Sequence, residues 1–532
     1  MTGWFNTRMM AVSALGVVYI AIACIVLAAI SVVLCFAIYL HFFVHRKYRH
    51  IPGPPRDSFF LGNLPAIFEY YENGKMFADA ITDWTAEYGP IIVVYLMNQV
   101  MIAANSPEAI KEFVISNGHP KSKHTYQDNV GYIYGSPLMG KSLVTEIDHE
   151  VWMRKRAICD PAFHRKSLRS SMNQFNSCGD LLVQKLSTMA DGKTEVVLLD
   201  QLNRVALDII AKIGFGLDLN VLFQEKSKFN EAVVTVLEAM DYNSKNPWDK
   251  YNPSSAMREY RQKARDACRL LREAGRECVQ KRLQSKSNGE TLPDDVMTLM
   301  MEAEERFEDL DGDADWTHIM DEFATFFIAG QETTANTLAF AFVELLQHPE
   351  IMHRLRTEID AVIGDNTDIK FEDLSKLCYT SAIIKETLRI YPPAICTVRD
   401  CAFDTTLHGI TIPKGATVTL FPYVTGRLES NFKDPLVFVP DRFLHQQETP
   451  PNTYFPFSVG PRSCIGKQFA MIEAKVLIAK LLKNFDFRLV PGQSYQVVQG
   501  GTIRPMDGCM VYINHRDAEI GDAVFDYHLE EK

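Results

Sequence analysis

One cysteine in this sequence lies in a setting that suits metal chemistry. The stretch from Phe457 to Gly466 reads FSVGPRSCIG and contains Gly460, Arg462 and Cys464. The glycines permit a tight turn that presents the sulfur at the start of a helix, where negative charge is favoured. We therefore expect Cys464 to ionise readily. A lone thiolate cannot form a closed zinc site, which takes four ligands, but it can be the axial ligand of haem iron.

A phosphate-binding loop is the alternative interpretation of the same stretch, and its spacing excludes it. Such a loop needs two glycines separated by four residues, followed by Lys and then Ser or Thr. Here Gly460 and Gly466 are separated by five residues, and Lys467 is followed by Gln468, which has no hydroxyl for magnesium.

The elements that position the cysteine are predicted to be mostly helices. Apolar residues recur at helical spacing after Cys464, and a second helix surrounds Glu386 and ends at Tyr391-Pro392-Pro393. A third helix is expected over about 317–347. The β-branched stretches 91–95 and 417–420 read as strands. The prediction is a mainly α domain with a minor β-sheet.

Composition excludes one class of function. The chain has 532 residues, is 47% hydrophobic and 23% charged, and carries a formal net charge of −11. An acidic balance argues against nucleic acid as the main partner. The eleven cysteines are scattered without CxxC pairs, which predicts free thiols rather than a disulfide framework.

The N-terminus is predicted to span a membrane once. No charged residue occurs from Met9 to Leu40, and residues 17–40 are almost wholly apolar, longer than the apolar core of a signal peptide. Arg46, Lys47 and Arg49 follow the span, so the positive-inside tendency places the remainder in the cytosol. We expect an anchor at 1–50, a stiff proline-rich connector at 51–55, and a catalytic domain over 51–532.

The pattern around Cys464 resembles the cysteine loop of the cytochrome P-450 superfamily. Glu386 and Arg389 form the ExxR motif of that family, and Arg442 lies in a later FVPDRF stretch. The resemblance covers the anchor, the connector and nearly all of the remaining chain. It implies the cytochrome P-450 fold, preceded by one N-terminal transmembrane helix. It also implies haem b as the cofactor, with Cys464 as the iron ligand.

The resemblance assigns further roles near the cofactor. Phe457 and Gly466 belong to the cofactor-binding loop, and Glu386, Arg389 and Arg442 would form a structural triad behind the haem. The resemblance implies haem-propionate contacts for four residues: Trp152, Arg156, Arg399 and Arg462. For Trp152 and Arg399, a plain packing or surface role is an open alternative.

The stretch from Ala329 to Thr334 matches the oxygen-activating segment of the family. Its small residues would let dioxygen and substrate approach a helix backbone. Thr333 would hydrogen-bond bound oxygen, and Glu332 would relay protons inward. Both are therefore predicted catalytic residues of a membrane-bound monooxygenase.

Four segments resemble the cholesterol-24-hydroxylating branch of the family, which predicts a sterol substrate: HIPGPP at 50–55, FIAGQETTAN at 327–336, TYFPFS at 453–458 and FRLVPGQ at 487–493. Gln331 and Ile395-Cys396 depart from that branch. Substrate-pocket residues are expected in the variable segments 126–138, 237–253 and 395–398.

The expected partners are O2, a sterol or other lipid substrate, the endoplasmic reticulum membrane and a NADPH-dependent cytochrome P-450 reductase. A separate reductase is expected because no GxGxxG fingerprint for NADPH or flavin follows a strand in this sequence. Arg154, Lys155 and Lys467 could dock the reductase, or could simply form a solvated face. The alternatives are a fatty-acid hydroxylase, a haem-thiolate isomerase and a non-catalytic haem- or sterol-binding membrane protein. Ala329 counts against the fatty-acid hydroxylases that carry glutamate there, and the Glu332–Thr333 pair counts against the other two.

Overall fold

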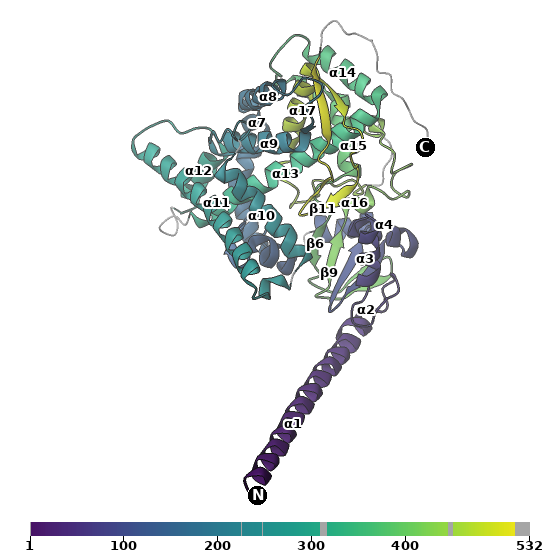
Figure 1. The fold of residues 1–532 in the computed structure, drawn as a ribbon. Coiled ribbons are helices and arrows are strands. Elements are labelled where there is room, and N and C mark those ends of the chain that lie inside the picture. Colours follow the sequence, from purple (N-terminus) through teal and green to yellow (C-terminus); the bar gives the residue numbers. More distant parts are fainter. Residues whose placement is uncertain are drawn as a thin grey trace.

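The protein is an assembly of helices with a small sheet near one edge, and a single long helix projects from that edge (Figure 1). The computed structural model describes residues 2–116, 118–224, 226–246, 248–308, 316–444 and 451–516. Helices predominate over strands among these residues, so the predicted fold class is confirmed.

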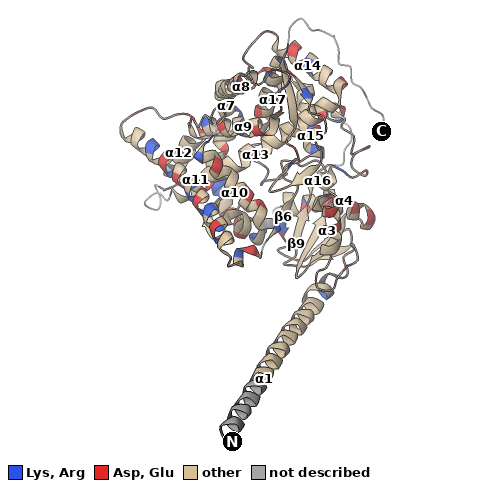
Figure 2. Cartoon of the chain, viewed as in Figure 1, with Lys and Arg blue, Asp and Glu red and all other residues tan. Residues whose placement is uncertain are grey.

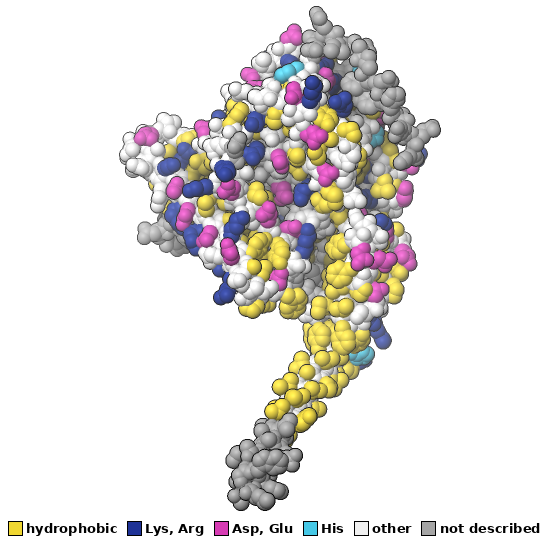
Figure 3. Space-filling view, in the orientation of Figure 1, with side chains coloured by type: hydrophobic (Ala, Val, Ile, Leu, Met, Phe, Trp, Pro, Cys, Tyr) yellow, Lys and Arg dark blue, Asp and Glu magenta, His cyan; other side chains and the backbone are white. Residues whose placement is uncertain are grey.

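The projecting helix begins at the N-terminus. Helix α1 (Thr2–Tyr39) continues directly into a π-helical segment (Leu40–His45) and helix α2 (Arg46–Tyr48). Within the part of the chain that the structure describes, Val18–Tyr48 is the one helical stretch long and apolar enough to cross a membrane. Apolar side chains cover its described surface, which carries no charged side chain before the junction with the body (Figures 2 and 3).

The end of this helix belongs to the core of the body. Leu40, Val44 and Tyr48 are buried against strand residues such as Val93. The predicted span ended at Leu40, but this side chain is fully buried by protein. The connector that follows is non-helical, as predicted, and the carbonyl of Pro52 accepts a hydrogen bond from Val93 N–H at 2.8 Å.

The largest sheet has four strands in the order β1-β2-β9-β6. Both predicted strands lie in it, since β1 is Ile91–Leu96 and β9 is Thr417–Leu420. β9 pairs in parallel with β2 (Gln99–Ala104) and antiparallel with β6 (Thr397–Asp400). The remaining strands form one three-stranded sheet and small hairpins: β3 (Tyr132–Ile133), β4 (Ser136–Pro137), β5 (Val196–Val197), β7 (Thr405–Leu407), β8 (Ile410–Ile412), β10 (Phe485–Leu489), β11 (Val497–Gln499), β12 (Ile503–Pro505) and β13 (Met510–His515).

Helix α13 (Thr317–Gln347) runs through the middle of the helical body, over the range predicted for it (Figure 1). Most of its side chains are buried, and it packs along α9 (Leu198–Phe215). The two other predicted helices are also present: α15 (Cys378–Ile390) surrounds Glu386, and α17 (Lys467–Asn484) follows Cys464.

The other α-helices surround this centre. They are α3 (Leu64–Glu72), α4 (Phe77–Tyr88), α5 (Pro107–Ile110), α6 (His149–Cys159), α7 (Arg165–Ser170), α8 (Met172–Ser187), α10 (Lys228–Lys245), α11 (Ser255–Ser287), α12 (Val296–Glu308), α14 (Pro349–Ile363) and α16 (Pro422–Thr425). Short π and 3-10 segments lie at Lys111–Ile115, His124–Gly131, Asp160–Phe163, Asp249–Tyr251, Asp373–Ser375 and Pro440–Phe443.

Candidate active site

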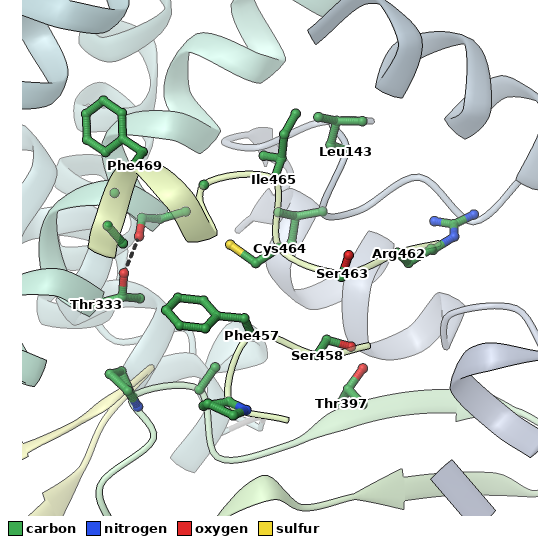
Figure 4. A pocket seen from close by; sticks show the side chains of 18 of the residues that line it. Leu143, Thr333, Thr397, Phe457, Ser458, Arg462, Ser463, Cys464, Ile465 and Phe469 are labelled. Carbon is green, nitrogen blue, oxygen red and sulfur yellow. Dashed lines mark hydrogen bonds between the residues drawn. The ribbon is translucent and has the colours of Figure 1, made fainter. Parts of the chain in front are cut away.

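A cavity of about 390 Å³ lies between α13, the start of α17 and strand β6. Its volume falls in the range of sites that bind cofactors and small molecules. Cys464 points into it, with Thr333 and Phe469 on one side and Phe457 below (Figure 4). The sequence-predicted cysteine loop and the predicted oxygen-activating segment therefore form two walls of one cavity.

Local backbone geometry positions the sulfur. Cys464 N–H donates to the carbonyl of Phe457 at 2.8 Å and closes the loop. Gly460 has φ +71°, and a Cβ at this position would lie 2.7 Å from the carbonyl oxygen of Val114. Only glycine fits a backbone of this conformation so close to its neighbour. Gly466 then precedes the first residue of α17, so the sulfur lies at a helix N-terminus, as predicted.

The predicted ready ionisation of Cys464 is wrong for the protein by itself. Desolvation by the surrounding protein raises the pKa of this thiol, although Cys464 is exposed on the cavity surface. The backbone N–H groups of Gly466 and Lys467 and the positive charge of Arg156 oppose that rise but do not overcome it. Desolvation of the thiolate thus outweighs the helix terminus. A bound metal cation reverses this balance, because it deprotonates a coordinating thiol.

The donor set of the cavity fits a metal that brings most of its own ligands. Cys464 and Cys396 are its thiols, and no histidine or carboxylate lines it. Across the described residues, no group of three or more His, Cys, Asp or Glu could hold a metal ion. Haem satisfies this condition, because its macrocycle supplies the nitrogen ligands and the protein supplies one axial thiolate.

Four cations line the same cavity, and no acidic side chain lines it with them, although Arg156 is paired with Asp160 outside the lining: Lys121, Arg156, Arg399 and Arg462. The pKa of Lys121 is well below its usual value because of burial and the nearby charges of Arg399 and Arg462. Burial and the charge of Arg399 lower the pKa of Arg462 to about 10. Such a cluster requires an anionic occupant, and the two propionates of haem b supply negative charge.

The predicted propionate contacts differ in what they touch. The guanidinium of Arg462 lies 4.4 Å from the ring of buried Trp152, so Trp152 packs against a cavity cation. Arg156 donates to Asp160 at 2.7 Å and to the carbonyl of Ser463 at 2.8 Å, which ties α6 to the cysteine loop. Arg399 donates to the hydroxyl of Thr397 at 3.0 Å. All four predicted residues are brought to the cavity.

Sequence reasoning missed Lys121, and it included Tyr126 only as the first residue of a predicted substrate segment. The Lys121 ammonium lies 4.3 Å from the Tyr126 ring centroid and donates to the carbonyl of Val144 at 2.7 Å. The Tyr126 hydroxyl lies 3.2 Å from the Thr397 hydroxyl. Tyr126 begins one of the predicted substrate segments, but no motif marks Lys121. Its isolated β-bridge to Arg399 is the feature that brings it to the cavity.

The predicted catalytic pair is split by the structure. Thr333 lines the cavity, and its hydroxyl donates to the carbonyl of Ala329 at 2.7 Å (Figure 4). Glu332 does not line the cavity, and its side chain instead hydrogen-bonds Thr502. Consecutive residues on a helix point about 100° apart, so the two side chains leave α13 on different faces.

The predicted structural triad is assembled. Glu386 accepts from Arg389 at 2.7 and 2.8 Å and from Arg442 at 3.2 Å, with all three side chains buried. Arg389 also donates to the carbonyls of Gly426 and Pro435 at 2.6 Å. Because the neighbouring residue Leu388 lines the cavity, the triad fixes one wall from behind.

The residues considered for reductase docking lie near the cysteine loop. Arg154 is exposed on α6, and Lys467 is exposed at the first turn of α17. Lys155 is less available, because its ammonium pairs with Glu146 at 3.1 Å. The free cysteines predicted from composition are confirmed, since all eleven are unpaired.

Replacing Lys121 with methionine is expected to weaken haem retention about 10- to 100-fold, the worth of one charge-assisted hydrogen bond. The measurement is the rate of haem transfer to an excess of a haem-scavenging protein. Arg154→Met is the matched control, because Arg154 is also a basic residue but does not line the cavity. Equal release rates in the two variants would contradict the proposal that Lys121 belongs to an anion-binding site.

Comparisons with known proteins agree with this geometry. The family model "Cytochrome P450" matches residues 52–505. Cytochrome P450 4d2 from Drosophila melanogaster is 28% identical over 82% of this chain and 88% of its own length. Cytochrome P450 3A41 from Mus musculus is 27% identical over 90% and 94%. Cytokinin hydroxylase from Arabidopsis thaliana is 28% identical over 81% and 82%.

Proposed function

Because the chain belongs to the cytochrome P450 family and is a haem-dependent monooxygenase, we propose that it hydroxylates a sterol at the endoplasmic reticulum membrane. The family uses haem ligated by a cysteine thiolate, a redox partner, O2 and lipophilic substrates. The proposal rests mainly on one observation: Cys464, Thr333 and an anion-binding cluster of basic residues line the same cavity, which is otherwise largely apolar.

Each group of cavity residues has a proposed task. Haem held by Cys464 would supply the activation of O2 and the insertion of one oxygen atom into a C–H bond. Arg462, Arg399, Lys121 and, through the loop, Arg156 would hold its carboxylates. Thr333 would direct a proton into the cavity from its hydroxyl. The apolar walls would exclude bulk water and orient a lipid.

Support for a sterol comes from the resemblance to cholesterol-24-hydroxylating enzymes. Two of the four similar segments contribute cavity walls, since Ala329, Gly330 and Thr333 belong to 327–336 and Phe455 to 453–458. Of the positions that depart from that branch, Gln331 lies outside the cavity lining and Cys396 lies within it. The shape of the cavity near Cys396 is therefore where this protein would select its own sterol.

The proposed orientation places the body on the cytosolic side. Arg46, Lys47 and Arg49 follow the apolar helix closely, which favours that side. A NADPH-dependent reductase on the same membrane would deliver electrons to the cysteine-loop side, where Arg154 and Lys467 are exposed. We propose residues 1–50 as the anchor and 51–532 as the catalytic domain.

The direct test is an optical titration of the haem-loaded full chain with cholesterol. Displacement of the axial water by cholesterol, seen as a shift of the haem absorption band, would support the sterol proposal. An unchanged spectrum with cholesterol and a shift with fatty acids would replace it with the fatty-acid alternative. The full chain is needed because Leu40, Val44 and Tyr48 belong to the core.

Thr333→Ala is expected to uncouple oxygen consumption from hydroxylation, because the hydroxyl that directs a proton into the cavity is lost. Product formed per NADPH oxidised should fall several-fold while hydrogen peroxide rises. Thr325→Ala is the control, since Thr325 also lines the cavity and bonds a helix carbonyl, that of Asp321, at 2.7 Å. Unchanged coupling in Thr333→Ala would contradict its catalytic role.

A further inference from the structure

Glu332 is held on the side of α13 that faces the hairpin of β11 and β12. Its carboxylate hydrogen-bonds the side chain of Thr502, which lies in the turn of this hairpin. The hairpin is fixed in place by its own pairing and by Ile503 N–H, which donates to the carbonyl of Pro393 at 3.1 Å. The contact between Glu332 and Thr502 is therefore part of a built structure.

A second polar side chain of α13 reaches the same hydroxyl. Asn336 lies one turn after Glu332 and donates to Thr502 at 2.8 Å. Asn336 is fully buried, and its Oδ1 accepts no hydrogen bond from the described protein atoms. Nearby Gln499 Oε1 is a further buried acceptor without a protein donor. Ordered water commonly satisfies buried acceptors of this kind, so these side chains form a polar site suited to binding water.

Charged groups lie between this polar site and solvent. Arg504 on β12 is exposed, and its charge lowers the pKa of Glu332, whereas Asp241 on α10 raises it. Asp241 pairs with Lys245 at 2.9 Å. The turn residue Gly500 packs against Asp241, since a Cβ on Gly500 would lie 3.6 Å from the Asp241 carboxyl carbon. Polar groups thus connect the surface to Glu332 between α10 and the hairpin.

We propose that the β11–β12 hairpin is the solvent-side half of a proton relay, in which Thr502 and Asn336 hold Glu332 at the point of proton entry. The inference rests on the proposed catalytic role of Glu332. The Glu332 carboxylate takes one proton from solvent water. As a carboxylic acid it passes that proton through intervening water to the Thr333 hydroxyl oxygen, because the two side chains leave α13 on different faces. The original Thr333 hydroxyl proton goes to the acceptor in the cavity. Glu332 returns to Thr502 as a carboxylate.

Thr502 is a positioning residue in this relay, and its removal has a spectroscopic consequence. Burial raises the pKa of Glu332, and the Thr502 hydrogen bond and the Arg504 charge lower it. Thr502→Val removes one lowering influence, so the pKa of Glu332 rises further. Arg504→Gln removes the other and shifts the pKa in the same direction. Glu332 then keeps its proton to higher pH and returns it less readily to solvent.

The experiment is an infrared pH titration of the carboxylic acid carbonyl band in the haem-loaded full chain, without substrate. The band of Glu332 is identified by its absence in Glu332→Gln. Thr406→Val is the matched control, because Thr406 is exposed on another small hairpin, β7–β8. An upward shift in Thr502→Val and Arg504→Gln, with none in Thr406→Val, supports the inference. An unshifted titration in both test variants overturns it.

Turnover separates this inference from the proposed function. With any substrate that the protein hydroxylates, Thr502→Val should lower the product formed per NADPH oxidised. It should also increase the effect of D2O on the turnover rate, whereas Thr406→Val should change neither quantity. Normal coupling in Glu332→Gln would remove the catalytic role of Glu332 itself. Normal coupling in Thr502→Val, with Glu332→Gln impaired, would overturn only the role of the hairpin. If cholesterol is not a substrate, the sterol proposal fails, but the roles of Glu332 and of the hairpin are still tested by these variants with another substrate.

Discussion

Cys464→Ser is expected to reduce monooxygenase activity to the background of free haem and to abolish the thiolate signature in the haem spectrum. Serine is nearly isosteric, but its hydroxyl does not replace the electron donation by which a thiolate favours O–O cleavage. The backbone bond from Cys464 N–H to Phe457 is independent of the side chain. The loop should therefore keep its shape, and the loss should be chemical.

Cys396→Ser provides the matched control for that result. Cys396 lines the same cavity, but its thiol lies apart from the helix terminus, and burial raises its pKa to about 12. The thiolate signature and the activity should survive its replacement. Retention of the signature in Cys464→Ser, or its loss in Cys396→Ser, would reassign the axial ligand. Both variants can be compared by absorption spectroscopy of the reduced, carbon monoxide-bound protein.

Glu386→Ala is expected to lower the free energy of unfolding by about 3–5 kcal/mol, the cost of leaving a buried charge without its partner. Two buried guanidiniums, those of Arg389 and Arg442, lose their common carboxylate in this variant. The backbone N–H of Val439 loses its acceptor as well, at 2.8 Å from Glu386. Urea unfolding of the haem-loaded protein, followed by circular dichroism, measures the change.

Asp266→Ala isolates burial as the cause. Asp266 pairs with Arg269 at the same i,i+3 spacing as Glu386 and Arg389, but its side chain is 50% exposed, whereas that of Glu386 is 0% exposed. An exposed helix pair contributes about 0.3–0.5 kcal/mol. A similar loss of stability in both variants would show that the triad contributes no more than a surface pair. Early haem loss in Glu386→Ala alone would link the triad to the cavity wall.

Much of the architecture could be predicted because it depends on local patterns. Helical periodicity located α17, the terminating prolines located the end of α15, and β-branched runs located β1 and β9. Helix α13 was also predicted over its observed range. The cysteine loop could be predicted for the same reason, since glycine at a positive φ beside Val114 leaves a recognisable spacing. A feature that depends on the residues of one short segment can be predicted from a single sequence.

The parts that could not be predicted depend on segments far apart in the chain. Lys121 reaches the cavity because a β-bridge joins it to Arg399. Glu332 faces outward because a hairpin 170 residues later in the chain supplies Thr502, and spacing on α13 alone does not show this. The ionisation of Cys464 was predicted wrongly because desolvation depends on the whole cavity, whereas the helix terminus is a local feature.

The junction between the projecting helix and the body has a mechanical consequence. Helix α1 passes without a flexible hinge into core residues Leu40, Val44 and Tyr48, and the connector is bonded to β1 through Pro52. In a bilayer, such a stiff joint couples the tilt of the helix to the tilt of the whole body. The thickness of the bilayer would then set the angle between the body and the bilayer surface. Membrane composition would in this way change how easily a lipid substrate enters the cavity.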